Sequence, residues 1–311
     1  MPGDHLNGTG TKTVTPAGRL RALLSENKTL VMPCCYDGIT ARLVEDGGFP
    51  LTFMTGFGVS ASRGFPDAQL VSFGEMLSSA TTIVAALRKG TPCIADGDTG
   101  YGNAVNVKRT VRGYAQVGMA GVMIEDQVAP KRCGHTRVKA VVGFDEALAR
   151  VRAACDARDE IRSAGLYGGN DICVMARTDA NNALDFEEAL RRCRAFREAG
   201  ADITFLEAPK SIEEMKRYCE EVEGPKLANM VEGGKTPVLP PSELQKMGYS
   251  IAAYPVSLLS ASIGAMRGAL EKIHKGEKLE EGKDILPFSD VCRQVGFEDY
   301  WEEEARYKTE K

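Results

Sequence analysis

Short apolar runs alternate with longer amphipathic stretches along most of this chain. The runs have the length of β-strands, and continuous apolar runs are typical of a parallel sheet buried on both sides. They lie at Leu30–Met32, Leu51–Met54, Pro92–Ala95, Gly121–Ile124, Ile172–Ala176, Ile203–Leu206, Lys226–Met230 and Ile251–Tyr254.

The segments between these runs carry apolar residues at helical spacing. The clearest are Gly74–Lys89, Ala104–Val117, Asp145–Ser163, Asp185–Ala199, Ile212–Glu223 and Pro241–Met247. Two of them run into Gly200 and Gly248 just before the next strand, which is typical of helix C-caps. Eight strand–helix units over about 250 residues predict a (β/α)8 TIM barrel. An open doubly wound sheet is the alternative, and the missing Rossmann fingerprint favours the barrel.

The two ends of the chain differ from this pattern. Residues 1–18 are rich in Gly, Thr and Pro without an apolar period, so we expect a flexible leader there. The barrel is expected over 19–273 and a C-terminal helical extension over 274–311. A helix is predicted at Ala261–Ile273, and the charged tail Phe297–Tyr307 is expected to pack on the barrel or on a neighbouring subunit.

Composition and charge exclude several classes of protein. The chain is 43% hydrophobic and 26% charged, with a formal charge of −4 and both signs mixed along it. This pattern excludes a nucleic-acid footprint and a polybasic membrane anchor. Apolar runs of membrane-helix length and signal-peptide features are missing, so a cytoplasmic location is expected. Nine cysteines without CxxC spacing are expected to be reduced and mostly buried.

Polar residues follow nearly every predicted strand, where barrel enzymes place their catalytic groups. They include Thr55, Asp96, Asp98, Glu125, Arg177, Glu207 and Asn229. A single carboxylate at such a position is more often a helix cap. At least four carboxylates on one rim, however, require a compensating cation.

The acidic residues predict a site for a hard metal ion. Oxygen ligands without a Cys or His cluster favour Mg²⁺, with Mn²⁺ as an alternative. Asp96 and Asp98 are two positions apart, so on a regular strand they share a face and could point at one ion. Glu125 on the next strand completes the second side, and Asp67 is a candidate for the water shell of the ion.

One cysteine differs from the other eight. Cys133 lies within Lys131–His135, where cations and an imidazole favour the thiolate and lower its pKa below about 8.5. Pro130, Gly134 and the length before Asp145 predict a mobile loop that closes over a substrate. The alternative is a solvated basic turn with an incidental cysteine.

These motifs resemble the isocitrate lyase and phosphoenolpyruvate mutase superfamily over nearly all of residues 17–307. The segments that carry the resemblance are Asp96–Gly102, Glu125–Gln127, Lys131–His135, Ala176–Asp179 and Asn229–Glu232. The chain looks most similar to the carboxyvinyl-carboxyphosphonate phosphorylmutase, methylisocitrate lyase, petal death protein and oxaloacetate acetylhydrolase branches. The resemblance implies a (β/α)8 barrel that assembles as a homotetramer, a dimer of dimers with C-terminal helices exchanged between subunits.

The resemblance also implies roles for individual residues. Asp96 and Asp98 would hold Mg²⁺, and Asp67 and Glu125 would reach it through water. Cys133 would be the acid/base of the gating loop, assisted by Lys131 and His135, and Arg177 would bind the oxygen next to the metal. The substrate would contact Thr55, Gly56, Phe57, Gly134, Arg177, Glu207, Asn229 and Ser257.

Two positions depart from the family pattern. Thr55 replaces the Ser that is common in the family's lyases and retains its hydroxyl. Phe57 replaces a smaller residue found in methylisocitrate lyase, and we expect it to narrow the pocket.

The expected function is Mg²⁺-dependent cleavage of a C–C bond in a small 2-hydroxy or 2-oxo di- or tricarboxylic acid through an enolate. Methylisocitrate, a substituted malate and oxaloacetate all suit it. The main alternative is a phosphonomutase, although mutases of this superfamily typically place Asn where this chain has Cys133. A barrel that only binds ligands is a third possibility, but it predicts damaged ligand positions, and these are intact.

Overall fold

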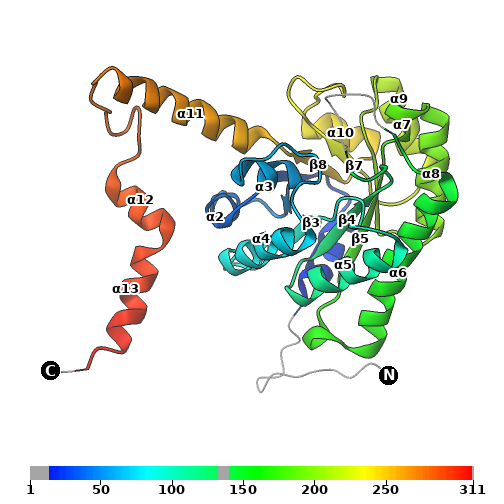
Figure 1. Cartoon of the computed structure of the whole chain (residues 1–311), viewed down its shortest axis with the longest axis horizontal. Helices are drawn as coiled ribbons and strands as arrows, with labels where there is room; N and C mark the ends of the chain where they lie inside the picture. Colours follow the sequence, from blue (N-terminus) through cyan, green and yellow to red (C-terminus); the bar gives the residue numbers. More distant parts are fainter. Residues whose placement is uncertain (1–13, 132–139, 310–311) are drawn as a thin grey trace. The chain divides into compact units, whose positions relative to one another are not determined.

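The computed structural model describes residues 14–131 and 140–309, which form two compact units that divide between Ser257 and Leu258 (Figure 1). The first unit contains eight parallel strands. They are β1 Leu30–Cys35, β2 Thr52–Met54, β3 Cys93–Asp96, β4 Gly121–Glu125, β5 Cys173–Thr178, β6 Ile203–Leu206, β7 Leu227–Asn229 and β8 Ile251–Tyr254. Each overlaps a predicted run.

The strands form a nearly closed barrel, which confirms the predicted fold. Hydrogen bonds connect them in the order β6-β5-β4-β3-β2-β1-β8-β7. Between β6 and β7 the connection is an isolated parallel bridge that pairs Thr204 with Lys226. Because all strands are parallel, their C-terminal ends lie at one rim of the barrel.

Helices surround the strands, as Figure 1 shows for α4, α5, α6 and α8. The helices of the first unit are α1 Pro16–Leu24, α2 Gly38–Asp46, α3 Gly56–Ser62, α4 Phe73–Ala86, α5 Ala104–Gln116, α6 Phe144–Ala164, α7 Ala180–Ala183, α8 Phe186–Glu198, α9 Ile212–Glu221 and α10 Pro241–Met247. The predicted amphipathic segments coincide with α4, α5, α6, α8, α9 and α10.

Helix α1 begins at Pro16, before the expected end of the leader. The Thr15 side chain accepts a hydrogen bond from the N–H of Gly18 and caps the helix. Ala17 and Leu20 are fully buried in the cluster that fills the barrel interior. Full burial of one leucine side chain contributes about 1.5–3 kcal/mol. The packing of Leu20 therefore anchors helix α1, which extends back into the last three residues of the expected leader.

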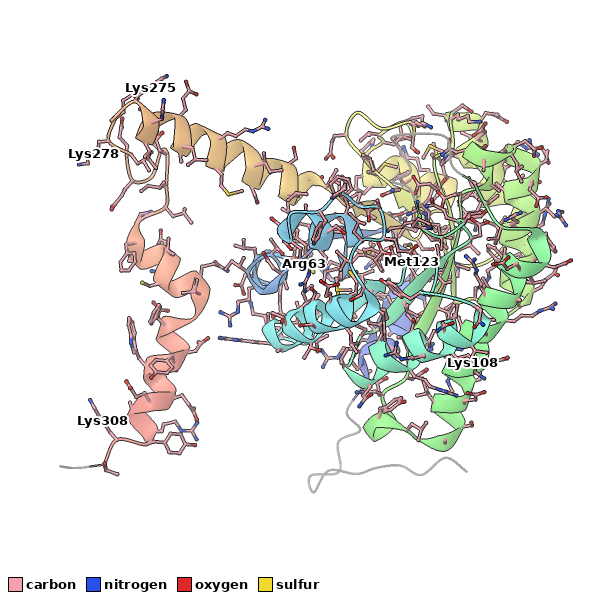
Figure 2. The ribbon with its side chains drawn as sticks, in the orientation of Figure 1. Arg63, Lys108, Met123, Lys275, Lys278 and Lys308 are labelled. Carbon is pink, nitrogen blue, oxygen red and sulfur yellow. The ribbon has the colours of Figure 1, made fainter. Side chains whose placement is uncertain are left out.

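Two layers of apolar side chains form the core. Inward-facing residues from the strands fill the barrel, and Met123 of β4 lies among them (Figure 2). A second cluster lies between the sheet and helices α8, α9 and α10, where Leu190, Met215 and Leu244 are fully buried. This packing holds the strand ends, and therefore the rim, in fixed positions.

The second unit consists of helices from the end of the chain. Helix α11, Ser257–His274, begins at the last residue of the first unit and contains the predicted helix Ala261–Ile273. Helices α12, Phe288–Val295, and α13, Phe297–Arg306, follow it. Gly296 joins α12 to α13 with a φ of 94°, a conformation that favours glycine. Among the described residues, no helix has the length and apolar character needed to cross a bilayer.

Candidate active site at the C-terminal rim

The structure brings most of the predicted site residues to the rim of the barrel. Asp96, Glu125 and Asn229 are the last residues of β3, β4 and β7, Arg177 lies near the end of β5, and Glu207 directly follows β6. These five residues therefore come from five different strands and share one end of the barrel.

Three aspartates surround the ammonium group of Lys131. Its Nζ lies 3.0 Å from Oδ1 of Asp67 and 3.8 Å from Oδ2 of Asp96, and it also pairs with Oδ1 of Asp98. Only 4% of Lys131 is exposed. Asp67, Asp96 and Asp98, three of the predicted acidic residues, therefore gather around the Lys131 ammonium group.

Asp98 reaches the Lys131 ammonium through a turn that the sequence pattern does not predict. It lies beyond the end of β3, in a left-handed conformation with a φ of 47°, so the shared-face argument for Asp96 and Asp98 was wrong. The Asp98 N–H donates to Oδ1 of Asp96 across 2.9 Å and tightens the turn. A Cβ on Gly97 would lie 2.5 Å from the Met123 carbonyl oxygen, so this turn needs glycine.

Burial and charge have opposite effects on the ionisable groups here. Burial raises the pKa of Asp98 to about 7, although Lys131 lowers it. Burial alone would lower the pKa of Lys131, but the field of Asp96, Asp98 and Asp67 outweighs it and raises that pKa well above its usual value. The cluster thus stabilises positive charge strongly.

The donor set fits a hydrated divalent ion. Its oxygens are carboxylates, which Mg²⁺ prefers, and the buried Glu125 Oε2 accepts no hydrogen bond within the described part of the chain. No three acidic, His or Cys side chains among the described residues form a ready-made cage. Mg²⁺ usually retains several waters and needs only one or two carboxylates, so such a cage is not required.

Arg177 is held by carboxylates on several sides. Its Nε and Nη2 each donate to Asp179 across 3.0 Å. Nε also lies 3.4 Å from Glu125 Oε2, and Nη2 lies 3.4 Å from Glu207 Oε2. The guanidinium carbon lies 5.0 Å from the centre of the Phe205 ring. Burial opposes its charge, but Glu207 and Glu125 raise its pKa, so the guanidinium presents a fixed positive charge.

The remaining predicted substrate residues have partners of their own. Nδ2 of Asn229 donates to Glu207 Oε2 across 3.3 Å, and the Ser257 hydroxyl donates to Glu232 across 2.7 Å. The first bond orients the last residue of β7, and the second joins the segment after β7 to the first residue of α11.

The predicted substrate loop, Thr55–Phe57, begins helix α3. Thr55 caps this helix, and the Gly56 N–H donates to Asp96 Oδ2 across 3.0 Å, so this amide already serves a predicted metal ligand. A Cβ on Gly56 would lie 2.5 Å from the same oxygen. Phe57 is half-buried.

Cys133, Gly134 and His135 lie outside the described residues, as does the rest of 132–139 in the predicted loop. The flanking chain is fixed, because Val128 donates to the Ala140 carbonyl and Val142 donates to the Asp126 carbonyl, each across 2.9 Å. An isolated antiparallel bridge between Gln127 and Val141 pairs the same two segments.

Two residues of the site were given no role by the sequence patterns. The Gln69 side chain accepts from the Lys131 N–H across 3.1 Å and donates to Thr99 across 2.8 Å. Asp179 binds Arg177, and its position two residues after that arginine was the available signal. Gln69 offered no signal beyond its closeness to Asp67.

A parallel eight-stranded barrel with buried charged side chains gathered at its C-terminal rim is the arrangement of a TIM-barrel enzyme. The phosphoenolpyruvate phosphomutase family model matches residues 20–274. This chain therefore belongs to the phosphoenolpyruvate phosphomutase family.

Similar proteins carry names from both predicted reaction classes. The chain is 42% identical to 2,3-dimethylmalate lyase of Eubacterium barkeri over 295 residues, 94% of this chain and 98% of that protein. It is 36% identical to chloroplastic carboxyvinyl-carboxyphosphonate phosphorylmutase of Arabidopsis thaliana over 310 residues, 97% of this chain and 88% of that one. The structure of oxaloacetate acetylhydrolase with 3,3-difluorooxalacetate superposes with a TM-score of 0.88 at 35% identity, covering 96% and 99% of the two chains.

Proposed function

We propose that this protein is a Mg²⁺-dependent lyase that cleaves a C–C bond in a small 2-hydroxy or 2-oxo dicarboxylic acid. The observation that carries this proposal is the guanidinium of Arg177, which lies 3.4 Å from both Glu125 and Glu207 beside the acidic cluster. A fixed cation next to a metal-binding cluster suits an oxyanion that develops during bond cleavage. The names of the relatives support the same chemistry.

Each residue has a distinct part in this reaction. Asp96 and Asp98 would hold the metal, and Asp67 and Glu125 would reach it through water. Bound Mg²⁺ supplies Lewis acidity and charge for a substrate oxygen. Arg177 would bind that oxygen while the substrate hydroxyl passes its proton to a rim carboxylate and becomes a carbonyl. A 2-oxo acid would first add water to its carbonyl to provide this hydroxyl. The electron pair of the broken bond passes to the carboxylate-substituted carbon.

The enolate formed on the leaving fragment then needs a proton. Cys133 supplies it, assisted by Lys131 and His135, and such acid catalysis contributes about 10²–10⁴ in rate. Thr55, Gly56, Phe57, Gly134, Glu207, Asn229 and Ser257 would shape the pocket around the substrate. Phe57 would narrow this pocket, and a narrower pocket would suit a compact acid of the substituted malate or oxaloacetate type better than a tricarboxylic acid.

A phosphonomutase is the second candidate, because the Arabidopsis relative bears a phosphorylmutase name at 36% identity. Phosphorus NMR separates the two reactions, since a mutase forms or moves a P–C bond and a lyase leaves it intact. Transfer of phosphorus with carboxyphosphonate substrates and no cleavage of hydroxy acids would overturn the lyase proposal.

The direct test is a panel of 2-hydroxy and 2-oxo dicarboxylic acids with Mg²⁺, assayed for pyruvate, glyoxylate and oxalate. We expect one substituted malate or oxaloacetate to be cleaved, and Asp96→Asn to lower turnover by at least about 100-fold. Asp159→Asn is the matched control, because Asp159 pairs with Arg158 on the outer helix α6. Equal losses in the two variants would contradict the assigned metal site.

We also propose a cytoplasmic homotetramer. The cysteines among the described residues are all free thiols, which suits a reducing compartment. Large apolar side chains such as Phe288 and Trp301 remain exposed on α12 and α13, which supports burial against another copy. Light scattering after gel filtration tests the assembly, and a monomeric mass would contradict it.

A further inference from the structure

Arg192 is a buried arginine that the reaction described above does not use. It lies on the outer helix α8, yet only 2% of it is exposed. Its three nitrogens each have an acceptor: Nη1 donates to Asp126 across 2.9 Å, Nη2 to the Val142 carbonyl across 3.0 Å, and Nε to Glu188 across 2.8 Å. The planar guanidinium is therefore fixed in one orientation.

Asp126 connects this arginine to the neighbouring strand. It directly follows Glu125 at the end of β4 and is 2% exposed. Its Oδ2 accepts from the Thr178 hydroxyl across 2.6 Å as well as from Arg192, and its Oδ1 accepts from the Asp179 N–H across 2.9 Å. The Asp126 carboxylate thus ties the end of β4 to the end of β5.

Asp179 carries the connection to the active site. Its backbone N–H is fixed by Asp126, and its two carboxylate oxygens hold Nε and Nη2 of Arg177 across 3.0 Å each. A bidentate pair of this kind sets both the position and the orientation of the guanidinium. A continuous series of charge-assisted hydrogen bonds therefore runs from helix α8 to Arg177.

We propose that Arg192 is a positioning residue that places Arg177 for catalysis by acting through Asp126 and Asp179. This inference rests on the proposed role of Arg177. Without the guanidinium of Arg192, the Asp126 carboxylate loses one of its hydrogen bonds and can rotate. This rotation moves the backbone amide of Asp179, and the guanidinium of Arg177 moves with it. A displacement of about 1 Å at a reacting centre lowers rate by about 100-fold.

The barrel contains a matched ion pair at its opposite end. Arg158 on α6 is 7% exposed and donates to Asp202 across 2.8 Å and to the Gly200 carbonyl across 2.7 Å. Asp202 also accepts from the Val174 N–H across 2.8 Å, as Asp126 does from Asp179. Arg158 and Arg192 therefore share burial and bonding chemistry, but Asp202 precedes β6 at the N-terminal end of the barrel.

The experiment compares Arg192→Met and Arg192→Lys with Arg158→Met and Arg158→Lys in the full-length protein. Thermal midpoint, kcat, KM and the affinity for oxalate with Mg²⁺ are measured for each. Oxalate is a suitable probe because it is a small dianion, and it is the product bound in a structure of oxaloacetate acetylhydrolase. We expect both methionine variants to lose thermal stability, but only Arg192→Met to lose at least about tenfold in kcat and in oxalate affinity.

The lysine variants separate positioning from stability. A lysine at 192 keeps the charge beside Asp126 but cannot bind Asp126, Val142 and Glu188 together. Arg192→Lys should therefore recover most of the thermal midpoint and little of the kcat. If Arg192→Met does not fold, the same comparison between the two lysine variants decides the question.

Values of kcat and oxalate affinity within twofold of the Arg158 variants would overturn the inference. The oxalate measurement keeps this result distinct from failure of the proposed function. A wild-type protein that cleaves no acid refutes the proposed reaction, whereas the ratio of oxalate affinities still reports whether Arg192 positions Arg177.

Discussion

The ammonium of Lys131 lies 3.0 Å from Oδ1 of Asp67, inside the cluster that also contains Asp96 and Asp98. A divalent ion at the proposed metal site would compete with this lysine for the same oxygens. The metal-free protein therefore depends on Lys131 to neutralise its rim.

Replacing Lys131 with methionine should destabilise the metal-free protein and increase its dependence on Mg²⁺. Removing one partner of a buried ion pair costs about 3–5 kcal/mol, because the remaining charges lose their compensation. We expect a lower thermal midpoint for Lys131→Met without metal and a larger rise on adding Mg²⁺ than in wild type. Lys89→Met is the control, because Lys89 forms an exposed pair with Asp46; equal responses would contradict the prediction.

Gly56→Ala should weaken metal binding through Asp96. The added methyl group would lie 2.5 Å from Asp96 Oδ2, so this carboxylate must move. We expect Mg²⁺ affinity and turnover to fall by about tenfold or more, measured by calorimetry and by substrate cleavage. Gly74→Ala in helix α4 serves as the comparison, since its nearest contact is 3.9 Å from Ser72 Oγ. An unchanged affinity in Gly56→Ala would refute the link.

Mg²⁺ affinity should depend on pH through Asp98. Burial raises the pKa of Asp98 to about 7, whereas an unfolded aspartate titrates near about 3.9. Between these values the folded, metal-free chain retains a proton that the unfolded chain releases, so stability falls as pH rises through this window. Mg²⁺ requires the ionised carboxylate, so its affinity should be about tenfold lower at about pH 6 than at about pH 8.

Calorimetry in buffers of different ionisation enthalpy measures the protons released by this binding. Release should be close to one proton per Mg²⁺ at about pH 6 and small at about pH 8. An affinity that is constant over this range would exclude Asp98 as the titrating group.

Cys133→Ser should separate binding from chemistry. The serine hydroxyl is a poor proton donor compared with a thiol, so turnover is expected to fall by at least about 100-fold while substrate and Mg²⁺ affinities change little. Cys292→Ser, in helix α12, tests for a general effect of removing a half-exposed thiol. Near-normal turnover in Cys133→Ser would remove this cysteine from the mechanism.

Strands that are buried on both faces were predictable from sequence, because their apolar runs are short and continuous. All eight predicted runs overlap observed strands, and the rim residues followed from the rule that parallel strands end together. Helix α1 did not follow from composition. Residues 16–18 of this helix were expected to belong to a leader because of their Pro and Gly content, whereas the burial of Ala17 in the barrel makes them part of the fold.

Contacts that depend on turns and on helix rotation could not be predicted from sequence. Asp98 joins Asp96 through a left-handed turn rather than through strand periodicity. Asp126 and Arg192 are 66 positions apart, and only the orientation of α8 against the sheet brings them together. The spacing of residues in the sequence predicts which side chains share a face within one strand or one helix. It does not predict a contact between two elements, such as the one between Asp126 and Arg192.

The isolated bridge between Thr204 and Lys226 makes the β6–β7 boundary the line along which local opening breaks the fewest ladder hydrogen bonds. Glu207 and Asn229 lie on either side of this line at the rim, joined by one side-chain hydrogen bond of 3.3 Å. We therefore expect the part of the rim between these two residues to widen at the lowest free-energy cost.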